Sequence, residues 1–264
     1  MASFPKRLQN QPAFVLQHWP YSETSLLVDQ FTQKSGRNTV LAKGARRQKS
    51  RYRGVLLPFQ PLSVLFTGKG DVKTLTGAES AGLRLILARD HLMCGFYINE
   101  INIKMLYRND PYEKLYSVYE RALLELSRQS DAEFTLRRFE KHLLEQAGYG
   151  LHLQTDIGTG LPIDKDVVYR YLPEIGPIVN SNSRSGGVMI HGDALIALEQ
   201  EEGFTDRIKR ELKQLNRTVL ATHLQGKPLN SRRMYAQLYP DKDSTETLAR
   251  HHEFKSVQIG GIDH

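Results

Sequence analysis

The spacing of apolar residues changes once along this chain of 264 residues, and the change divides it into two kinds of structure. Up to about residue 80, apolar and β-branched residues alternate in short runs that Gly, Pro, Ser and Asn separate. From Gly82 onward, apolar residues recur about every 3.6 positions, which is the period of a helix. An α+β chain is therefore predicted, with a strand-rich domain at residues 1–80 and a helical domain at residues 81–240.

Five short strands are predicted within the first domain from alternation and turn residues. They are Ala13–His18, Ser25–Phe31, Asn38–Lys43, Leu62–Thr67 and Val72–Thr76. Five strands in so short a stretch suit a small closed barrel, and an OB-fold is favoured because such barrels commonly bind nucleic acid. An SH3-like barrel fits the same pattern.

Helix signals appear in the second domain. Asp110 is a candidate N-cap, Pro111 suits the first helical position, and Glu113 has capping-box spacing. A further helix is predicted over about Ala132–Ala147, where Gly148 supplies a stop signal.

Residues 150–190 change character, since they are rich in Gly, Asp, Pro, Asn and Ser. This composition predicts an irregular insertion containing a hairpin, with Ile178–Val179 and Val188–Ile190 as its arms and Asn180–Gly187 as a mobile loop. Helical spacing then returns over three segments: Asp193–Glu199, Asp206–Leu224 and Ser231–Leu238. Residues 241–264 form a polar tail that we expect to be disordered.

Positive charge is concentrated at the N-terminal end. Residues 1–80 hold twelve Lys and Arg against four Asp and Glu, a net charge of +8, whereas the rest of the chain has a net charge of −1. No acidic residue lies between Asp29 and Asp71. Such an asymmetry indicates a polyanionic partner. A membrane surface is disfavoured because no strongly amphipathic helix accompanies the charge.

The densest part of this charge is the run from Lys43 to Arg53, with six cations in eleven residues. Cations neutralise phosphates, and the aromatic ring inside the run, Tyr52, has the chemistry to stack on a base. A solvated loop is the alternative interpretation. The predicted DNA-binding residues are Lys34, Arg37, Lys43, Arg46, Arg47, Lys49, Arg51, Tyr52 and Arg53, with Trp19 and Tyr21 as weaker stacking candidates.

A second candidate site is on the helix predicted over about Ala132–Ala147. Leu136, Phe139 and Leu143 share its apolar face. At about 100° per residue, Arg137 lies at the edge of that face, whereas Arg138 is expected to point away. A guanidinium beside an apolar groove can clamp a carboxylate, although an arginine that merely covers the core edge fits the pattern as well.

Other functional classes find little support in the sequence. The single cysteine, Cys94, excludes an internal disulfide and fits a reducing cytosol. No apolar run is long enough for a membrane span. The enzyme signatures HExxH, GxSxG and paired CxxC are missing, so no catalytic residue is assigned. Asp164 and Asp166 suit a magnesium ion, but two spaced loop carboxylates are more often just solvated.

Several blocks of the chain, in order, resemble the RecO family of bacterial recombination mediators. The similar residues are Phe14–Leu16, Pro20–Leu26, Phe31–Thr32, Gly36–Arg37, Lys43–Arg46, Pro58–Phe59, Pro61–Leu62, Tyr97–Glu100, Leu136–Glu140, Gly148–Gly150, Gly226–Leu229 and Ser231–Arg232. The resemblance extends to about Pro240.

This resemblance implies a non-enzymatic DNA-repair protein of the bacterial cytoplasm and nucleoid. Such a protein binds single- and double-stranded DNA, anneals complementary strands and helps to load RecA. The implied partners are RecR and the acidic C-terminal tail of single-strand-binding protein, for which Arg137 becomes the candidate clamp. Many family members hold zinc in the helical domain. Here Cys94 lies outside residues 151–190, so we expect neither a zinc site nor any other cofactor.

Three alternatives stay open at this stage. A general RNA-binding OB protein would use the same basic barrel. A metal-dependent nuclease would need Asp164 and Asp166 as ligands. A structural adaptor would bind proteins only, although the N-terminal charge disfavours it.

Overall fold

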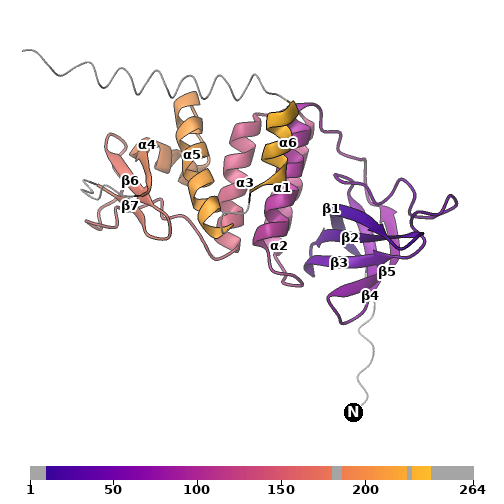
Figure 1. Cartoon of the computed structure of the whole chain (residues 1–264). Helices are drawn as coiled ribbons and strands as arrows, with labels where there is room; N and C mark the ends of the chain where they lie inside the picture. Colours follow the sequence, from indigo (N-terminus) through magenta and orange to yellow (C-terminus); the bar gives the residue numbers. More distant parts are fainter. Residues whose placement is uncertain (1–9, 180–185, 225–227, 239–264) are drawn as a thin grey trace, which may run out of the picture. The chain divides into compact units, whose positions relative to one another are not determined.

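The computed structural model describes residues 10–179, 186–224 and 228–238 (Figure 1). Residues 180–185 of the loop expected at 180–187 lie outside these ranges, and so does the expected polar tail at 241–264. By its internal contacts the chain forms two compact units, Met1–Lys227 and Pro228–His264, which are described separately. In the second unit, α6 (Asn230–Leu238) is the helix predicted from Ser231.

The N-terminal strands form a closed barrel, and all five predicted strands are confirmed. They are β1 (Gln11–Tyr21), β2 (Ser25–Thr32), β3 (Gly36–Ala42), β4 (Leu62–Thr67) and β5 (Val72–Ser80). The order is β1-β2-β3-β5-β4, and β1 pairs with β4 to close the barrel. All pairs are antiparallel except β3 with β5. This order is that of an OB-type barrel, which confirms the favoured fold.

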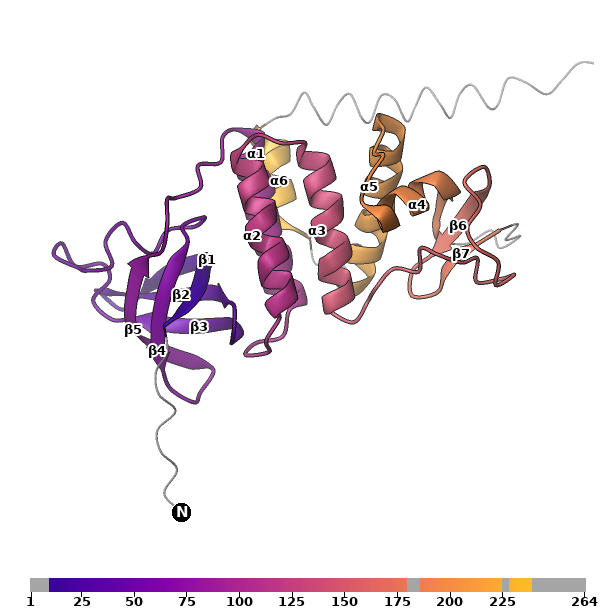
Figure 2. The ribbon, with the colours of Figure 1, turned by 180° about the vertical axis from the view of Figure 1, so that it is seen from behind.

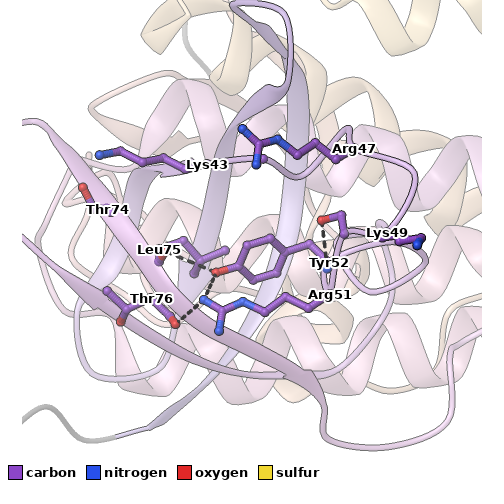
Figure 3. Close-up of a pocket in the computed structure, with 10 residues that line it drawn as sticks. Lys43, Arg47, Lys49, Arg51, Tyr52, Thr74, Leu75 and Thr76 are labelled. Atoms are coloured by element: carbon purple, nitrogen blue, oxygen red, sulfur yellow. Dashed lines mark hydrogen bonds between the residues drawn. The ribbon is translucent and has the colours of Figure 1, made fainter.

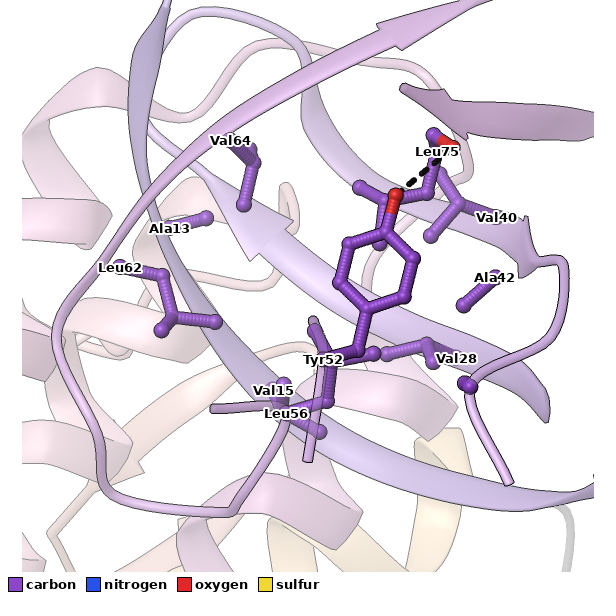
Figure 4. Packing of buried hydrophobic residues seen from close by; sticks show 11 residues of the cluster. Ala13, Val15, Val28, Val40, Ala42, Tyr52, Leu56, Leu62, Val64 and Leu75 are labelled. Carbon is purple, nitrogen blue, oxygen red and sulfur yellow. Dashed lines mark hydrogen bonds between the residues drawn. The ribbon is translucent and has the colours of Figure 1, made fainter. Parts of the chain in front are cut away.

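Alternate residues of the strands fill the barrel interior. Val28 lies opposite Val40, and Ala13 opposite Leu62, so that their side chains meet in one apolar cluster with Val64 and others (Figure 4). The loop between β3 and β4 adds three buried side chains to the same cluster, Ala45, Tyr52 and Leu56. The interior is therefore completed by a loop residue that the strand pattern does not contain.

Helices cover the outer face of β1, β2 and β3. These helices are α1 (Asp90–Met105) and α2 (Glu113–Ser127). Tyr119 of α2 places its ring 5.3 Å from that of Phe14 and 5.6 Å from that of Phe31. From α1, the Asn99 side chain donates a hydrogen bond of 2.8 Å to the Leu16 carbonyl. Residues 28–32 of β2 are therefore all buried, because both faces of the strand are covered.

The remaining helices of the first unit are α3 (Ala132–Gln146), α4 (Gly192–Gln200) and α5 (Asp206–His223). Figures 1 and 2 show α1, α2 and α3 side by side. The predicted stop of α3 is confirmed: Gly148 has a φ of 86°, and Tyr149 N–H donates back to the Leu144 carbonyl.

The predicted start of α2 is wrong. The helix begins at Glu113 with Tyr112 as its N-cap, and no side chain caps it. The reason lies in the preceding segment, where Asn109 N–H donates to the Arg37 carbonyl of β3 at 2.7 Å. That bond holds the chain against the barrel and delays the helix beyond Asp110 and Pro111.

The insertion contains a small sheet of β6 (Val168–Leu172), β7 (Gly176–Ile178) and β8 (Val188–His191). The predicted hairpin is wrong, because its two arms do not pair with each other. Each pairs instead with β6, in the order β7-β6-β8. The central strand buries Tyr169 and Tyr171, whose hydroxyls accept hydrogen bonds from the backbone N–H groups of Asp164 and His152. These two rings tie parts of the irregular segment to the central strand.

Candidate nucleic-acid interface

The basic run follows β3 as a chain of consecutive turns. Arg47 N–H donates to the Gly44 carbonyl, Ser50 N–H to Arg47, and Arg53 N–H to Ser50, at 3.0–3.1 Å. Arg46 N–H donates to the Thr24 carbonyl at 2.8 Å and ties the run to the turn between β1 and β2. The basic run therefore has a defined backbone that orients its side chains.

Tyr52 anchors this run to the barrel instead of facing solvent. Only 5% of the residue is exposed, and its hydroxyl donates to the Leu75 carbonyl at 3.2 Å (Figure 4). The expectation that Tyr52 stacks on a base needs correction, because its ring is packed in the barrel core. Of the weaker candidates, Tyr21 is 48% exposed, whereas Trp19 is half-buried.

Arg51 contacts both this tyrosine and strand β5. One of its terminal nitrogens donates to the Thr76 carbonyl at 2.7 Å and lies 2.8 Å from the Tyr52 hydroxyl. Its guanidinium also lies 4.9 Å from the centroid of the Tyr52 ring. Strands β3 and β5 pair only as far as Leu41 and Thr74. Beyond that point the basic run, rather than β3, bonds two carbonyls of β5, those of Leu75 and Thr76.

A pocket of about 600 Å³ lies between the basic run and β5 (Figure 3). We call it the seam pocket; its lining is Lys43, Gly44, Arg47, Lys49, Ser50, Arg51, Tyr52, Thr74, Leu75 and Thr76. Four of these described residues are cations and none is acidic. Such a concentration of cations at one concave site favours a phosphate-bearing ligand.

The other predicted DNA-binding cations lie elsewhere. Arg46 and Arg53 are exposed and donate to the carbonyls of Ser22 and Gln48, and neither lines the seam pocket. Lys34 is exposed in the turn between β2 and β3. The structure thus brings together five of the nine predicted residues: the cations Lys43, Arg47, Lys49 and Arg51, and the buried Tyr52.

Arg37 is the second predicted residue that needs correction. It is 8% exposed, lies 3.5 Å from the Asp29 carboxylate and donates to the Leu106 carbonyl at 3.2 Å. Burial lowers the pKa of Arg37, although Asp29 opposes the shift. Its charge therefore connects the barrel to the end of α1 and is not offered to a phosphate.

The candidate clamp, Arg137, is also buried. It is 6% exposed and donates to the Glu140 carboxylate at 2.8 Å, while its Nε has no hydrogen-bond partner among the described residues. Glu140 additionally accepts from the Tyr97 hydroxyl at 2.5 Å and from the Asn216 amide at 2.7 Å. Glu140 is a buried acceptor that joins α1, α3 and α5. Its spacing of three residues from Arg137 was the only sequence signal for it.

Arg138 does not point away as expected. It is 4% exposed and lies 2.6 Å from the Glu125 carboxylate and 3.8 Å from that of Glu201. The expectation failed because α3 packs against α1, α2, α4 and α5, so that more than one face of the helix is covered. A helical wheel with a single apolar stripe cannot represent that environment.

The ion pair of Arg138 predicts acid sensitivity. Burial disfavours the charge of Glu125, but hydrogen bonds from Arg138, Arg121 and Thr135 outweigh it and hold the pKa of Glu125 below its ordinary value. The carboxylate therefore stabilises the fold above about pH 4.3, the ordinary value for Glu, and the contribution is lost as the pH falls through the folded pKa.

We expect Glu125→Gln to flatten the fall in the free energy of unfolding between pH 6 and pH 3, measured by urea titration at each pH. Glu120→Gln, at an exposed position of the same helix, is the control and should keep the parent slope. Equal slopes for the two variants would contradict the assignment to the Arg138 pair.

Neither a metal centre nor a membrane segment is evident in the described part of the chain. Within it, no three His, Cys, Asp or Glu side chains are grouped in a way that would hold a metal ion. The Asp164 carboxylate, considered above for magnesium, accepts a hydrogen bond from Asp166 N–H at 3.0 Å. None of the described helices has the length and apolar character to cross a bilayer.

A closed OB-type barrel with a cation-lined pocket, followed in the chain by a helical domain, defines the class of protein to which this chain belongs. Family models identify the class more closely. Residues 7–84 match the N-terminal domain of recombination protein O, and residues 87–233 match its C-terminal domain. The chain belongs to the RecO family.

Three relatives show the extent of the similarity, and each is named DNA repair protein RecO. The one from Nitrosospira multiformis is 44% identical over 230 residues, which is 87% of this chain and 95% of the relative. The one from Dechloromonas aromatica is 39% identical over 235 residues, covering 88% and 97%. The one from Haemophilus influenzae is 40% identical over 227 residues, covering 86% and 95%.

Proposed function

We propose that this protein is a DNA-binding recombination mediator in DNA repair, which acts by binding and not by catalysing a reaction. The observation that carries the proposal is the acid-free group of four cations in the seam pocket of a RecO-family barrel. The proposed ligands are single- and double-stranded DNA, and the proposed outcome is annealing of complementary strands and assistance to RecA loading. The proposed location is the bacterial cytoplasm, at the nucleoid.

The proposed mechanism is charge neutralisation. Two DNA strands repel each other through their phosphates, and cations that cover those phosphates allow the strands to approach. Lys43, Arg47, Lys49 and Arg51 would supply this neutralisation, with Lys34, Arg46 and Arg53 extending it over the neighbouring surface. Tyr21 is the exposed ring next to Ser22, whose carbonyl accepts from Arg46, and it is the candidate for base stacking.

We propose residues 1–80 as the DNA-binding domain and residues 81–240 as the domain that receives protein partners. The partners are RecR and the acidic C-terminal tail of single-strand-binding protein. A protein that binds DNA at one site and single-strand-binding protein at a second, linked site raises the local concentration of each partner near the other. Arg137 is the proposed tail contact: its Nε donor has no hydrogen-bond partner among the described residues, and because that atom is buried, a tail carboxylate has to displace neighbouring side chains to reach it.

The first prediction is a salt-dependent affinity for single-stranded DNA, measured by fluorescence anisotropy across a salt series. If each seam-pocket cation neutralises one phosphate, these four contacts contribute a slope of about 3 to the plot of log affinity against log salt, at about 0.7 per contact. Binding that ignores salt, or no binding at low salt, would exclude the DNA-binding proposal. Preference for RNA in competition would instead favour a general RNA-binding protein.

A separate prediction tests the tail site. Arg137→Lys retains a cation for Glu140 but removes the Nε donor and the planar fork, so we expect binding of a tail peptide to weaken about 10-fold. Lys141→Arg, a charge-conserving change on the same helix, is the control. Unchanged peptide affinity in Arg137→Lys would remove Arg137 from the site without touching the DNA-binding proposal.

A further inference from the structure

The outer face of β2 and β3 is not open to a ligand in this protein. In OB-folds this face is the usual place for oligonucleotides. Here the outward side chains Asp29, Phe31, Arg37 and Thr39 are all buried. Phe31 packs against the rings of Tyr116 and Tyr119, and Arg37 bonds the Leu106 carbonyl. A nucleic acid bound by this barrel must therefore use another part of its surface.

The seam between β3 and β5 is the part of the barrel built differently. The pairing of β3 with β5 ends at Leu41 and Thr74. After Thr74 the basic run, and not β3, lies against β5 (Figure 3). The Leu75 and Thr76 carbonyls are already bonded by Tyr52 and Arg51, so this edge of β5 is not free to add a strand from a partner. What remains open is the concave space between the seam-pocket cations and the strand.

We infer that the seam pocket binds the backbone of one nucleic-acid strand and admits it in single-stranded form, so that single strands and duplexes use different parts of the basic surface. This inference rests on the proposed DNA-binding function and specifies where and how a strand is held.

Size and chemistry both support a single strand. A cavity of about 600 Å³ takes a nucleotide or two of a flexible strand, whereas a duplex, whose two backbones are fixed across paired bases, can only lie over its mouth. Cationic grooves that follow one backbone are typical of single-strand binders. Ser50 accepts a hydrogen bond from Tyr52 N–H at 3.2 Å, and a hydroxyl that accepts in this way can still donate its hydrogen to a phosphate oxygen.

Rigidity of the pocket adds to the argument. Its floor is the buried ring of Tyr52, and its wall is a strand paired with β4 from Thr67 and Thr74 to Leu62 and Ser80. A preformed site loses less conformational entropy on binding than a flexible loop of the same charge. The four cations around this preformed floor and wall should therefore contribute more to the binding free energy per charge than the cations outside the pocket.

The test compares two triple variants that remove the same charge. The pocket variant is Lys43→Ala, Arg47→Ala and Lys49→Ala; the matched variant is Lys34→Ala, Arg46→Ala and Arg53→Ala, whose residues lie outside the pocket. Arg51 is kept in both because it bonds the Thr76 carbonyl. Affinity for a labelled single strand and for a blunt duplex is measured by anisotropy at 0.1 M salt, after thermal melting has shown that both variants fold.

We expect the pocket variant to lose about 100-fold in single-strand affinity. At 0.1 M salt each lost phosphate contact lowers the logarithm of the affinity by about 0.7, so three contacts lower it by about 2. The matched variant should lose about 10-fold or less, and the two should lose similar duplex affinity. Equal single-strand losses, with binding still present in the parent, would overturn the seam pocket but leave the DNA-binding proposal standing. No binding by the parent chain would overturn the proposed function itself.

A change of shape without a change of charge gives a second, independent arm. Thr74→Phe fills the pocket from a half-buried position on β5, where an aromatic residue suits a strand. We expect it to lower single-strand affinity at least 10-fold while duplex affinity changes less than 2-fold. Should both affinities stay at the parent values, the strand does not enter the pocket.

Discussion

Replacing Glu140 with Ala is expected to lower the free energy of unfolding by about 3–5 kcal/mol, the cost of breaking a buried ion pair from one side. Glu140 is 1% exposed and accepts from Tyr97, Arg137 and Asn216, which come from three helices. Without the carboxylate, the Arg137 charge and two neutral donors lose the buried acceptor that they share. Urea unfolding followed by circular dichroism measures the change.

Two further variants give this prediction its controls. Glu133→Ala removes a carboxylate from the same helix, but its side chain is 50% exposed, so we expect a change within about 0.5 kcal/mol. Glu140→Gln keeps the shape and one acceptor, and it should fall between the two alanine variants. A Glu140→Ala protein as stable as Glu133→Ala would contradict the role of Glu140 as the central acceptor.

The barrel was predictable because strand alternation is a local signal. Inward residues such as Val28 and Val40 have to repeat at every second position if one face is to be apolar. The order of the strands was expected only as part of an OB-fold, since the parallel pairing of β3 with β5 joins segments more than thirty residues apart. No local pattern carries that information.

The basic surface was predictable in part, and the residues that were placed wrongly share a cause. Charge density along the chain located the cations of the seam pocket. It gave no measure of depth, so Arg37 and Tyr52 were counted with their exposed neighbours. Arg37 is buried because its guanidinium contacts the Asp29 carboxylate and the Leu106 carbonyl. Tyr52 is buried because its ring packs into the core of the barrel beside β5. Both causes depend on distant segments.

The helical domain shows the same division. The end of α3 follows from Gly148, which adopts a positive φ with little strain. The start of α2 does not follow from Asp110, because a bond from Asn109 to the barrel overrides the capping signal. Sequence therefore located elements well where their ends are set by nearby residues, and poorly where the barrel and the helices meet.

That meeting region is the subject of the second large prediction, in which Tyr119→Ala lowers the free energy of unfolding by about 3–5 kcal/mol, as for other large-to-small changes at buried aromatic positions. Tyr119 is fully buried, and its ring contacts Phe14 and Phe31 of the barrel and Phe139 of α3. Its removal leaves a cavity between α2 and the elements that its ring contacts, which are β1, β2 and α3. Because each of these is held by its own packing, they cannot move in far enough to fill the cavity.

A conservative variant separates the ring from the hydroxyl. The Tyr119 hydroxyl donates to the Asn99 side chain at 2.7 Å, and Asn99 donates to the Leu16 carbonyl of β1. Tyr119→Phe keeps the ring contacts but leaves the Asn99 oxygen without this donor, which costs about 1–3 kcal/mol. Tyr107→Ala, at a tyrosine that is 69% exposed, serves as the control and should change stability little. If Tyr119→Phe lost as much as Tyr119→Ala, the hydrogen-bond chain to β1, rather than the aromatic packing, would hold the barrel to the helices.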